Sequence, residues 1–330
     1  MQNKTLMQRF IGAPEFGPLV LLIVELIVFT AASKDMSFMS ALNISNILMF
    51  TVELGMIALA MTLLMTAGEF DLSVGSVFGF SAVILWTLYN VAGTPMWAAF
   101  LIAMAIALFI GWVNGVYVTR LKVPSFLVTL GMLLVVRGVA LYITDGFPQR
   151  PSSVADSTFA YVLVGDFQIG GFRVYMSVLW FLLFVVLTHY VLNHSKAGNW
   201  IQAAGGNANA ARNRGVQVDR TKVALFMLSA AMAAFAGIIS SIRTAAANPN
   251  SGMGYELEVI AMVVIGGTVL TGGRGTILGT VLGIFILRAM RNGIVMIGVP
   301  GLAYNIFIGA IILAMMALHS WLERRHNAGT

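Results

Sequence analysis

Long apolar runs with almost no charge recur along the whole chain, and they limit what it can fold into. A bilayer core about 30 Å thick needs roughly 20 apolar residues for each helical crossing. Because a helix satisfies its backbone polar groups internally, such runs predict transmembrane helices. Ten runs are visible, at about 16–32, 47–66, 74–92, 96–119, 124–143, 174–192, 222–243, 257–270, 276–295 and 300–321.

Composition agrees with a chain that lies mostly in lipid. Of the 330 residues, 59% are hydrophobic and 10% are charged, whereas soluble domains are about half apolar and about a quarter charged. Ten crossings use about 200 residues, which leaves no room for a soluble domain of about 100 residues. We therefore predict an all-α polytopic membrane protein with about ten transmembrane helices, in one domain covering residues 1–330.

The first apolar run, from Phe16 to Ala32, has two interpretations. It follows Lys4 and Arg9, as the core of a signal peptide follows basic residues. The run is long for such a core, however, and many further apolar segments come after it. We therefore predict an uncleaved first helix.

The basic residues predict the orientation in the membrane. Lys and Arg concentrate in cytoplasmic loops, and with both termini inside, 12 of the 19 basic residues fall on cytoplasmic segments. Helix ends thus account for the net charge of +6, and we predict no nucleic-acid partner. The 12 residues are Lys4, Arg9, Arg120, Lys122, Lys196, Arg212, Arg214, Arg220, Lys222, Arg274, Arg324 and Arg325.

Three segments outside the spans follow from this orientation. Residues 1–15 form a short cytoplasmic N-terminus, and residues 144–173 form an external loop with room for a short surface helix. Residues 193–221 form a long cytoplasmic loop. Within it, Asn207 is suited to the N-cap and Gly215 to the end of a short helix, so we predict a helix between them.

Glycines spaced four residues apart mark helix faces that pack closely. Small residues at that spacing let helix backbones approach each other in lipid. We predict that most of them serve packing alone, while a few line a path or permit movement. The residues are Gly75, Gly79, Gly111, Gly115, Gly275, Gly279 and Gly283.

Familiar catalytic patterns are missing from the sequence. It contains no G-x-x-x-x-G-K-[ST], H-E-x-x-H or G-x-S-x-G segment and no cysteine, so the common phosphate-cradling, zinc-protease and serine-hydrolase motifs are absent. We predict no catalytic, cofactor or metal site in this chain. The four histidines are predicted to lie at cytoplasmic helix ends or in the C-terminal tail: His189, His194, His319 and His326.

Charged residues inside the predicted spans are few, and Glu25, Glu53 and Arg137 are the clearest. An ionisable group in a span usually faces a partner or a wet cavity. Glu53 and Arg137 therefore either pair with each other or line a solute path, and both interpretations remain open. Asp71 and Ser73 also have two interpretations, because they are placed to favour and cap a helix N-terminus or to contact the solute.

Four blocks, in order, resemble the permeases of ribose-type ABC importers over about residues 45–320. Two departures stand near the first block, where Glu69-Phe70 replaces the family's usual Gly-Ile and Ala60 stands where glycine is common. The blocks are Met61 to Ser76, which contains Asp71-Leu72-Ser73-Val74-Gly75-Ser76; Asn114-Gly115 with Leu121 to Gly131 and Arg137-Gly138; Gly205-Gly206-Asn207 with Ala210-Ala211-Arg212, Gly215-Val216 and Arg220-Thr221-Lys222; and Gly266-Gly267-Thr268 with Gly272 to Thr276 and Asn292-Gly293.

The resemblance implies a type II ABC importer-like permease bundle in a bacterial inner membrane. It implies that two permease chains, identical or related, pair with two cytoplasmic ATPase subunits that hold ATP and Mg²⁺. It also implies that an extracytoplasmic binding protein delivers a sugar, and it leaves the choice among pentoses, hexoses, sugar alcohols and furanosyl signalling molecules open.

Two sets of site residues follow. The resemblance implies an ATPase-coupling segment, and the alternative for the same residues is a solvated basic loop. The coupling residues are Gly205, Gly206, Asn207, Ala210, Ala211, Arg212, Arg214 and Gly215. Candidate residues of the translocation path are Glu53, Glu69, Asp71, Ser73, Asn114, Thr129 and Arg137.

Two other classes of function compete with an importer permease. A secondary transporter would work alone on an ion gradient, although the chain lacks the rich acid or histidine chain of a proton-coupled pump. A membrane-embedded enzyme acting on lipid would need a catalytic cluster, and none is visible in the sequence.

Overall fold

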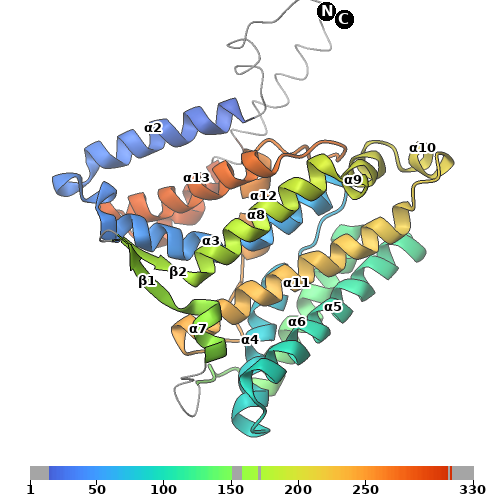
Figure 1. Cartoon of the computed structure of the whole chain (residues 1–330), viewed down its shortest axis with the longest axis horizontal. Coiled ribbons are helices and arrows are strands. Elements are labelled where there is room, and N and C mark those ends of the chain that lie inside the picture. Colours follow the sequence, from blue (N-terminus) through green and yellow to red (C-terminus); the bar gives the residue numbers. More distant parts are fainter. Residues whose placement is uncertain (1–14, 151–157, 170–171, 311–312, 314–330) are drawn as a thin grey trace, which may run out of the picture.

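The computed structural model is a bundle of α-helices (Figure 1). It describes residues 15–150, 158–169, 172–310 and 313. The predicted N-terminal segment 1–15, apart from Glu15, and most of the predicted last span at 300–321 lie outside the described residues. The longer helices are α2 (Phe16–Ala32), α3 (Ala41–Thr66), α4 (Val74–Val91), α5 (Met96–Arg120), α6 (Ser125–Thr144), α8 (Met176–His194), α11 (Val218–Thr244) and α13 (Ile277–Met296).

Seven of the described helices are long and apolar enough to cross a membrane, namely α3, α4, α5, α6, α8, α11 and α13. Helix α2 is slightly shorter, with 17 residues, and coincides with the predicted first span. Residues 304–310 are helical at the start of the predicted last span. The predicted all-α polytopic bundle is confirmed, whereas the number of ten crossings stays a prediction.

The predicted span at 257–270 is wrong as a continuous helix. Helix α12 (Tyr255–Ile265) has only 11 residues, so it is about 16 Å long and covers about half of a bilayer core. Irregular backbone precedes it at 245–254 and follows it at 266–276. Non-helical backbone at membrane depth is tolerated where protein surrounds it, and both irregular segments contact the helices of the core.

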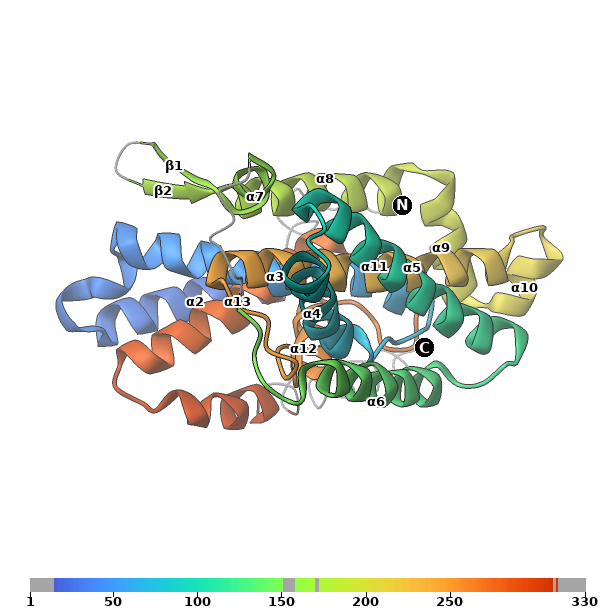
Figure 2. The same cartoon turned by 90° about the horizontal axis from the view of Figure 1, so that it is seen from below.

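The two ends of the bundle carry different short elements (Figures 1 and 2). One end holds α9 (Lys196–Gly206) and α10 (Ala208–Asn213). The opposite end holds α7 (Thr158–Val164), which is the short helix expected in the loop 144–173. It also holds a hairpin of β1 (Asp166–Ile169) and β2 (Phe172–Tyr175) that the sequence did not predict. Two 3-10 turns complete the described elements, η1 (Lys34–Met39) and η2 (Gly301–Ala303).

The core forms around α3 and α11. In α3, 78% of the most apolar window is buried inside the protein, against 17% in α6, so α3 is internal and α6 presents its side chains outward. Helix α11 packs against α3, α4 and α5, and α12 packs against α3 and α13. A buried hydrogen bond, 2.7 Å long, joins the hydroxyl groups of Thr62 on α3 and Thr280 on α13.

The spaced glycines are packing positions, as predicted. A Cβ atom added to Gly111 or Gly115 on α5 would collide with the backbone of α11, near Phe226 and Val223 respectively. A Cβ added to Gly279 or Gly283 on α13 would collide with carbonyl oxygens at the end of α12. These helices therefore approach each other backbone to backbone, as small residues allow in lipid.

We expect Gly279→Ala to destabilise the bundle, because the added methyl group would overlap the carbonyl oxygen of Gly266. Overpacking of this kind costs about 1–3 kcal/mol. Gly131→Ala on α6 is the matched control, since a Cβ there has no neighbour within 4 Å and alanine favours a helix. Thermal unfolding in detergent measures both variants, and equal melting temperatures would contradict the close α12–α13 contact.

Candidate functional site

The predicted short helix in the loop 193–221 is confirmed as α10. The Asn207 side chain accepts a hydrogen bond from the Ala210 amide at 2.9 Å, which is the N-cap interaction. Gly215 lies just past the helix with φ +81°, a conformation that glycine adopts at little cost. Local sequence thus fixes both ends of a helix of only six residues.

Helix α10 has one side that packs and one that faces outward. Ala211 is buried against Ala204 and Val218, and Arg212 Nη2 donates to Asp219 Oδ1 at 2.6 Å. Arg214 is exposed. Asn207, Ala210 and Gly215, from the predicted coupling set, are exposed as well.

A groove of about 430 Å³ lies beside α10. Arginine side chains dominate its charge, and Asp219 is the acidic residue that lines it. An open, mostly basic groove next to an exposed short helix is suited to an acidic surface of a partner. The lining residues are Arg120, Arg212, Val216, Gln217, Val218, Asp219 and Arg220.

The end of α9 touches two irregular segments through a cluster that we call the glycine junction: Gly68, Gly205, Gly272 and Gly273. A Cβ on Gly205 would collide with the carbonyl oxygen of Thr66 at the end of α3 and with the Gly273 amide. That amide donates to the same Thr66 oxygen at 2.8 Å. The junction therefore joins α9 directly to the turn after α3 and to the segment that follows α12.

Gly206 lies beside the junction but is not part of its close contact. A Cβ there would be 3.9 Å from its nearest neighbour, the Cα of Gly273, which is an ordinary van der Waals distance. The two adjacent glycines of the predicted coupling set thus have different roles, with Gly205 in backbone contact and Gly206 open.

Glu69 ties the turn between α3 and α4 to α11. Its carboxylate accepts from Lys222 Nζ at 2.5 Å, and both side chains are largely buried. The neighbouring Phe70 amide donates to Ser125 Oγ at 3.3 Å, at the start of α6. The glutamate that departs from the family pattern is therefore matched by a lysine on another helix.

Asp71, Ser73 and Asn114 form a fully buried polar cluster between α4, α5 and α11. Asp71 Oδ1 accepts from the Ser73 amide at 2.9 Å and from its hydroxyl at 2.6 Å. Asn114 Nδ2 donates to Ser73 Oγ at 3.0 Å. The idea that Ser73 caps α4 is wrong, because its side chain makes no capping hydrogen bond and donates to Asp71 instead.

Arg137 makes its hydrogen bonds to backbone carbonyl groups and not to Glu53. Its Nη1 donates to the carbonyl oxygens of Pro249 at 2.6 Å and Ser251 at 2.8 Å, in the irregular segment before α12. The possible Glu53–Arg137 pair is wrong, because Glu53 Oε1 accepts from Arg243 Nη2 at 2.5 Å. An arginine with five donors can hold a non-helical turn by its carbonyl groups.

Thr129 is fully buried on α6, and its hydroxyl donates to the Ser125 carbonyl at 2.8 Å. The structure therefore does not gather the predicted path residues at one place. Glu53 and Glu69 pair with different residues of α11, and Arg137 holds the irregular segment before α12. The buried cluster of Asp71, Ser73 and Asn114 is separate from these, and Thr129 stands apart. Their contact with a solute stays a prediction.

A second charged cluster was not singled out from the sequence. Tyr304 donates to Glu258 Oε1 at 2.7 Å, and Arg288 Nη2 lies 3.4 Å from the same oxygen. Arg291 Nη1 lies 3.8 Å from Glu258 Oε2. Arg288 and Arg291 are three residues apart and therefore lie on one helix face, in a mostly apolar run. This pair of charges was the sequence feature that could have indicated the cluster.

The described part of the chain is thus a bundle of helices long and apolar enough to cross a membrane, with a broken segment at α12 and an exposed short helix at one end. The family model described as "Branched-chain amino acid transport system / permease component" matches residues 43–316. The chain belongs to this family, and within it to the permeases of ribose-type ABC importers. It is a multi-pass inner-membrane protein.

Several curated proteins are similar over nearly their whole length. The ribose import permease protein RbsC of Escherichia coli (strain K12) is 34% identical over 299 residues, covering 90% of this chain and 91% of the relative. The xylose transport system permease protein XylH of the same strain is 30% identical, covering 92% and 91%. The galactose/methyl galactoside import permease protein MglC is 33% identical, covering 91% and 92%. No solved structure matches.

We expect Glu53→Leu to destabilise the protein by about 3–5 kcal/mol, because it leaves Arg243 as an unpaired, largely buried charge. The double variant Glu53→Leu/Arg243→Leu is expected to recover much of that loss, since an apolar pair of similar volume is often tolerated. Melting temperatures of the two single variants and the double variant form the test. Strictly additive losses would contradict a direct interaction between the two side chains.

Proposed function

We propose that this chain is the transmembrane permease subunit of an ATP-driven, binding-protein-dependent importer for a sugar or a similar small polar solute. The supporting observation is its similarity to three sugar permeases over about nine tenths of each chain. The capped helix α10 lies within the matched region and supplies an exposed surface for a partner.

The proposed assembly contains two permeases, either two copies of this chain or this chain and a related one. Two cytoplasmic ATPase subunits bind ATP and Mg²⁺ and supply the energy. An extracytoplasmic sugar-binding protein delivers the solute to the opposite face. Under this proposal the chain itself binds no nucleotide, metal or other cofactor.

We place the α9–α10 end in the cytoplasm, together with both chain termini. Eight basic residues of the described chain are found at or near that end, whereas Lys34, Arg150 and Arg173 are found at the opposite one. The positive-inside bias favours this orientation. The eight residues are Arg120, Lys122, Lys196, Arg212, Arg214, Arg220, Lys222 and Arg274.

Alternating access is the proposed mechanism. Closure of the ATPase subunits moves α10, and the glycine junction passes the movement to the turn after α3 and to the segment after α12. The Glu69–Lys222 pair links the same turn to α11. These contacts are made by backbone or by buried side chains. Because such packed groups compress little, a displacement of one element moves its neighbour by a similar amount. A switch of the central helices between outward and inward access follows.

Arg214→Glu is expected to abolish the stimulation of ATP hydrolysis by the binding protein while leaving the chain folded. Arg214 is exposed, whereas Arg212 also holds Asp219, so Arg214 is the cleaner test of docking. Lys196→Glu on α9 is the control for a charge reversal at the same end. Hydrolysis by the purified complex is measured with and without binding protein.

Full stimulation in Arg214→Glu, and also in the double variant Arg212→Glu/Arg214→Glu, would count against α10 as the coupling helix. Loss of stimulation in Lys196→Glu as well would point to a general effect of charge at this end.

The glycine junction gives a sharper comparison between neighbouring residues. Gly205→Ala is expected to lower sugar uptake at least about tenfold, because the new methyl group separates α9 from Thr66 and a backbone clash must be relieved by displacement. Gly206→Ala is expected to retain uptake, since its Cβ has room. Uptake by proteoliposomes holding the full complex is the measurement, and equal uptake by the two variants would contradict the junction's role.

A further inference from the structure

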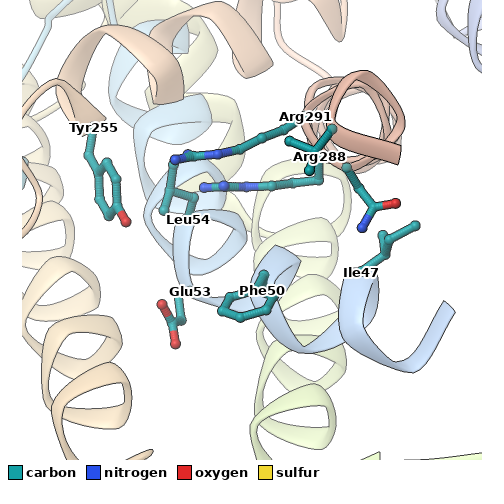
Figure 3. Close-up of a pocket in the computed structure, with 9 residues that line it drawn as sticks. Ile47, Phe50, Glu53, Leu54, Tyr255, Arg288 and Arg291 are labelled. Atoms are coloured by element: carbon teal, nitrogen blue, oxygen red, sulfur yellow. The ribbon is translucent and has the colours of Figure 1, made fainter. Parts of the chain in front are cut away.

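A cavity of about 360 Å³ lies between α3, the start of α12 and α13, away from α10 and the glycine junction. Figure 3 shows Arg288 and Arg291 extending side by side from α13, with Glu53 and Phe50 on α3 and the ring of Tyr255 facing the same space. Its volume lies within the range of roughly 300–1,000 Å³ for small-molecule sites. The lining residues are Ile47, Phe50, Glu53, Leu54, Tyr255, Arg288, Arg291, Asn292 and Val295.

Arg288 is the residue that most needs an explanation. Its side chain is only 7% exposed, yet its Nε and Nη2 atoms make no hydrogen bond to any described residue. The contact of Nη2 with Glu258 at 3.4 Å is electrostatic. Leaving donors of a charged group buried without acceptors is costly, and this incompletely satisfied arginine lines the wall of the cavity.

The charges around the cavity do not cancel. Glu53 is paired with Arg243, and Glu258 contacts both Arg288 and Arg291. Three guanidinium groups thus share two carboxylates. Arg291 is half exposed and can be screened by solvent, which leaves Arg288 as the buried donor group with unused capacity.

The cavity offers acceptors as well as donors. The carboxylate of Glu53 lines it together with the two arginines, whereas the amide of Asn292, which also lines it, makes two hydrogen bonds with Asn43. A hydroxyl group accepts from a guanidinium and donates to a carboxylate at the same time, so a polyol can satisfy both kinds of partner. The Phe50 and Tyr255 rings and Ile47, Leu54 and Val295 supply apolar surface for the carbon skeleton.

We propose that this cavity is a transit site for a neutral polyol, that is, a free sugar, and that Arg288 is the residue that binds its hydroxyl oxygens. The proposal rests on the proposed function, because it names where an imported sugar is held within the permease. It assigns the solute to the α3–α13 cavity and not to the Asp71–Ser73–Asn114 cluster, which is fully buried.

The absence of cysteine from the sequence makes a direct test possible. Ile47→Cys places one thiol at the cavity wall, and Leu42→Cys places one on the same helix at a position that is 76% exposed and does not line the cavity. A methanethiosulfonate reagent labels either thiol in the complete chain, purified with its ATPase subunits. D-ribose, D-xylose and D-galactose serve as neutral probes and D-glucuronate as the anionic probe.

We expect at least one neutral sugar to slow labelling of the Ile47→Cys variant and none to slow labelling of the Leu42→Cys variant. At a sugar concentration about twice Kd the rate should fall about threefold, because the unoccupied fraction is 1/(1 + [L]/Kd). Adding Arg288→Met should abolish the protection, and Arg288→Lys should weaken it. Arg291→Gln, at a half-exposed position, provides a second variant should Arg288→Met fail to fold, and it should reduce the protection without abolishing it.

Three outcomes would overturn the transit site: no protection by any neutral sugar, protection by glucuronate alone, or protection that is undiminished in Arg288→Met and in Arg291→Gln. Measuring both sugar protection and binding-protein-stimulated ATP hydrolysis on the same complex tests this proposal separately from the proposed function on which it rests. Stimulated ATP hydrolysis without sugar protection would refute the cavity site and leave the importer function standing. Protection by a sugar without stimulated ATP hydrolysis would support the cavity site and count against the importer function.

Discussion

Backbone contact at glycines is the constraint on which the rest of this structure depends. The chain runs irregularly at 67–73, 245–254 and 266–276, and such backbone cannot face lipid because its polar groups would lack partners. It must therefore lie against other parts of the protein. The glycine junction and the α12–α13 contact meet that requirement, and Arg137 supports the segment before α12 by donating to its carbonyl oxygens.

The same contacts account for how a helix at the surface can act on the interior. Helix α10 is too short to be stable alone, but α9 fixes it to the turn after α3 and to the segment after α12. The Glu69–Lys222 pair fixes that turn to α11. Displacement of one exposed helix therefore reaches three central elements through a few close contacts. In this scheme ATP is needed only on the partner subunits, and the bundle needs no catalytic group of its own.

Local features were predictable from sequence, whereas long-range pairing was not. Asn207 and Gly215 determine a helix between them, and glycines four residues apart determine a packing face, because both effects act within a few residues. A pair between Arg137 and Glu53 was one of two open interpretations, but Arg137 instead donates to backbone carbonyl groups of residues 249 and 251. Glu53 instead meets Arg243, 190 residues away. The glycines at 266–275 indicated a possible break at the end of the predicted span at 257–270, but the apolar composition of this span did not show that α12 has only 11 residues.

Sugar uptake by proteoliposomes tests the central claim most directly, because it separates a permease driven by partner ATPases from a transporter that works alone. One set of liposomes holds this chain with its partner permease, its ATPase subunits and external binding protein, and the other holds this chain alone. The account predicts uptake only in the first set, and only with ATP on the ATPase side. Uptake by the chain alone, driven by an ion gradient without ATP, would contradict it.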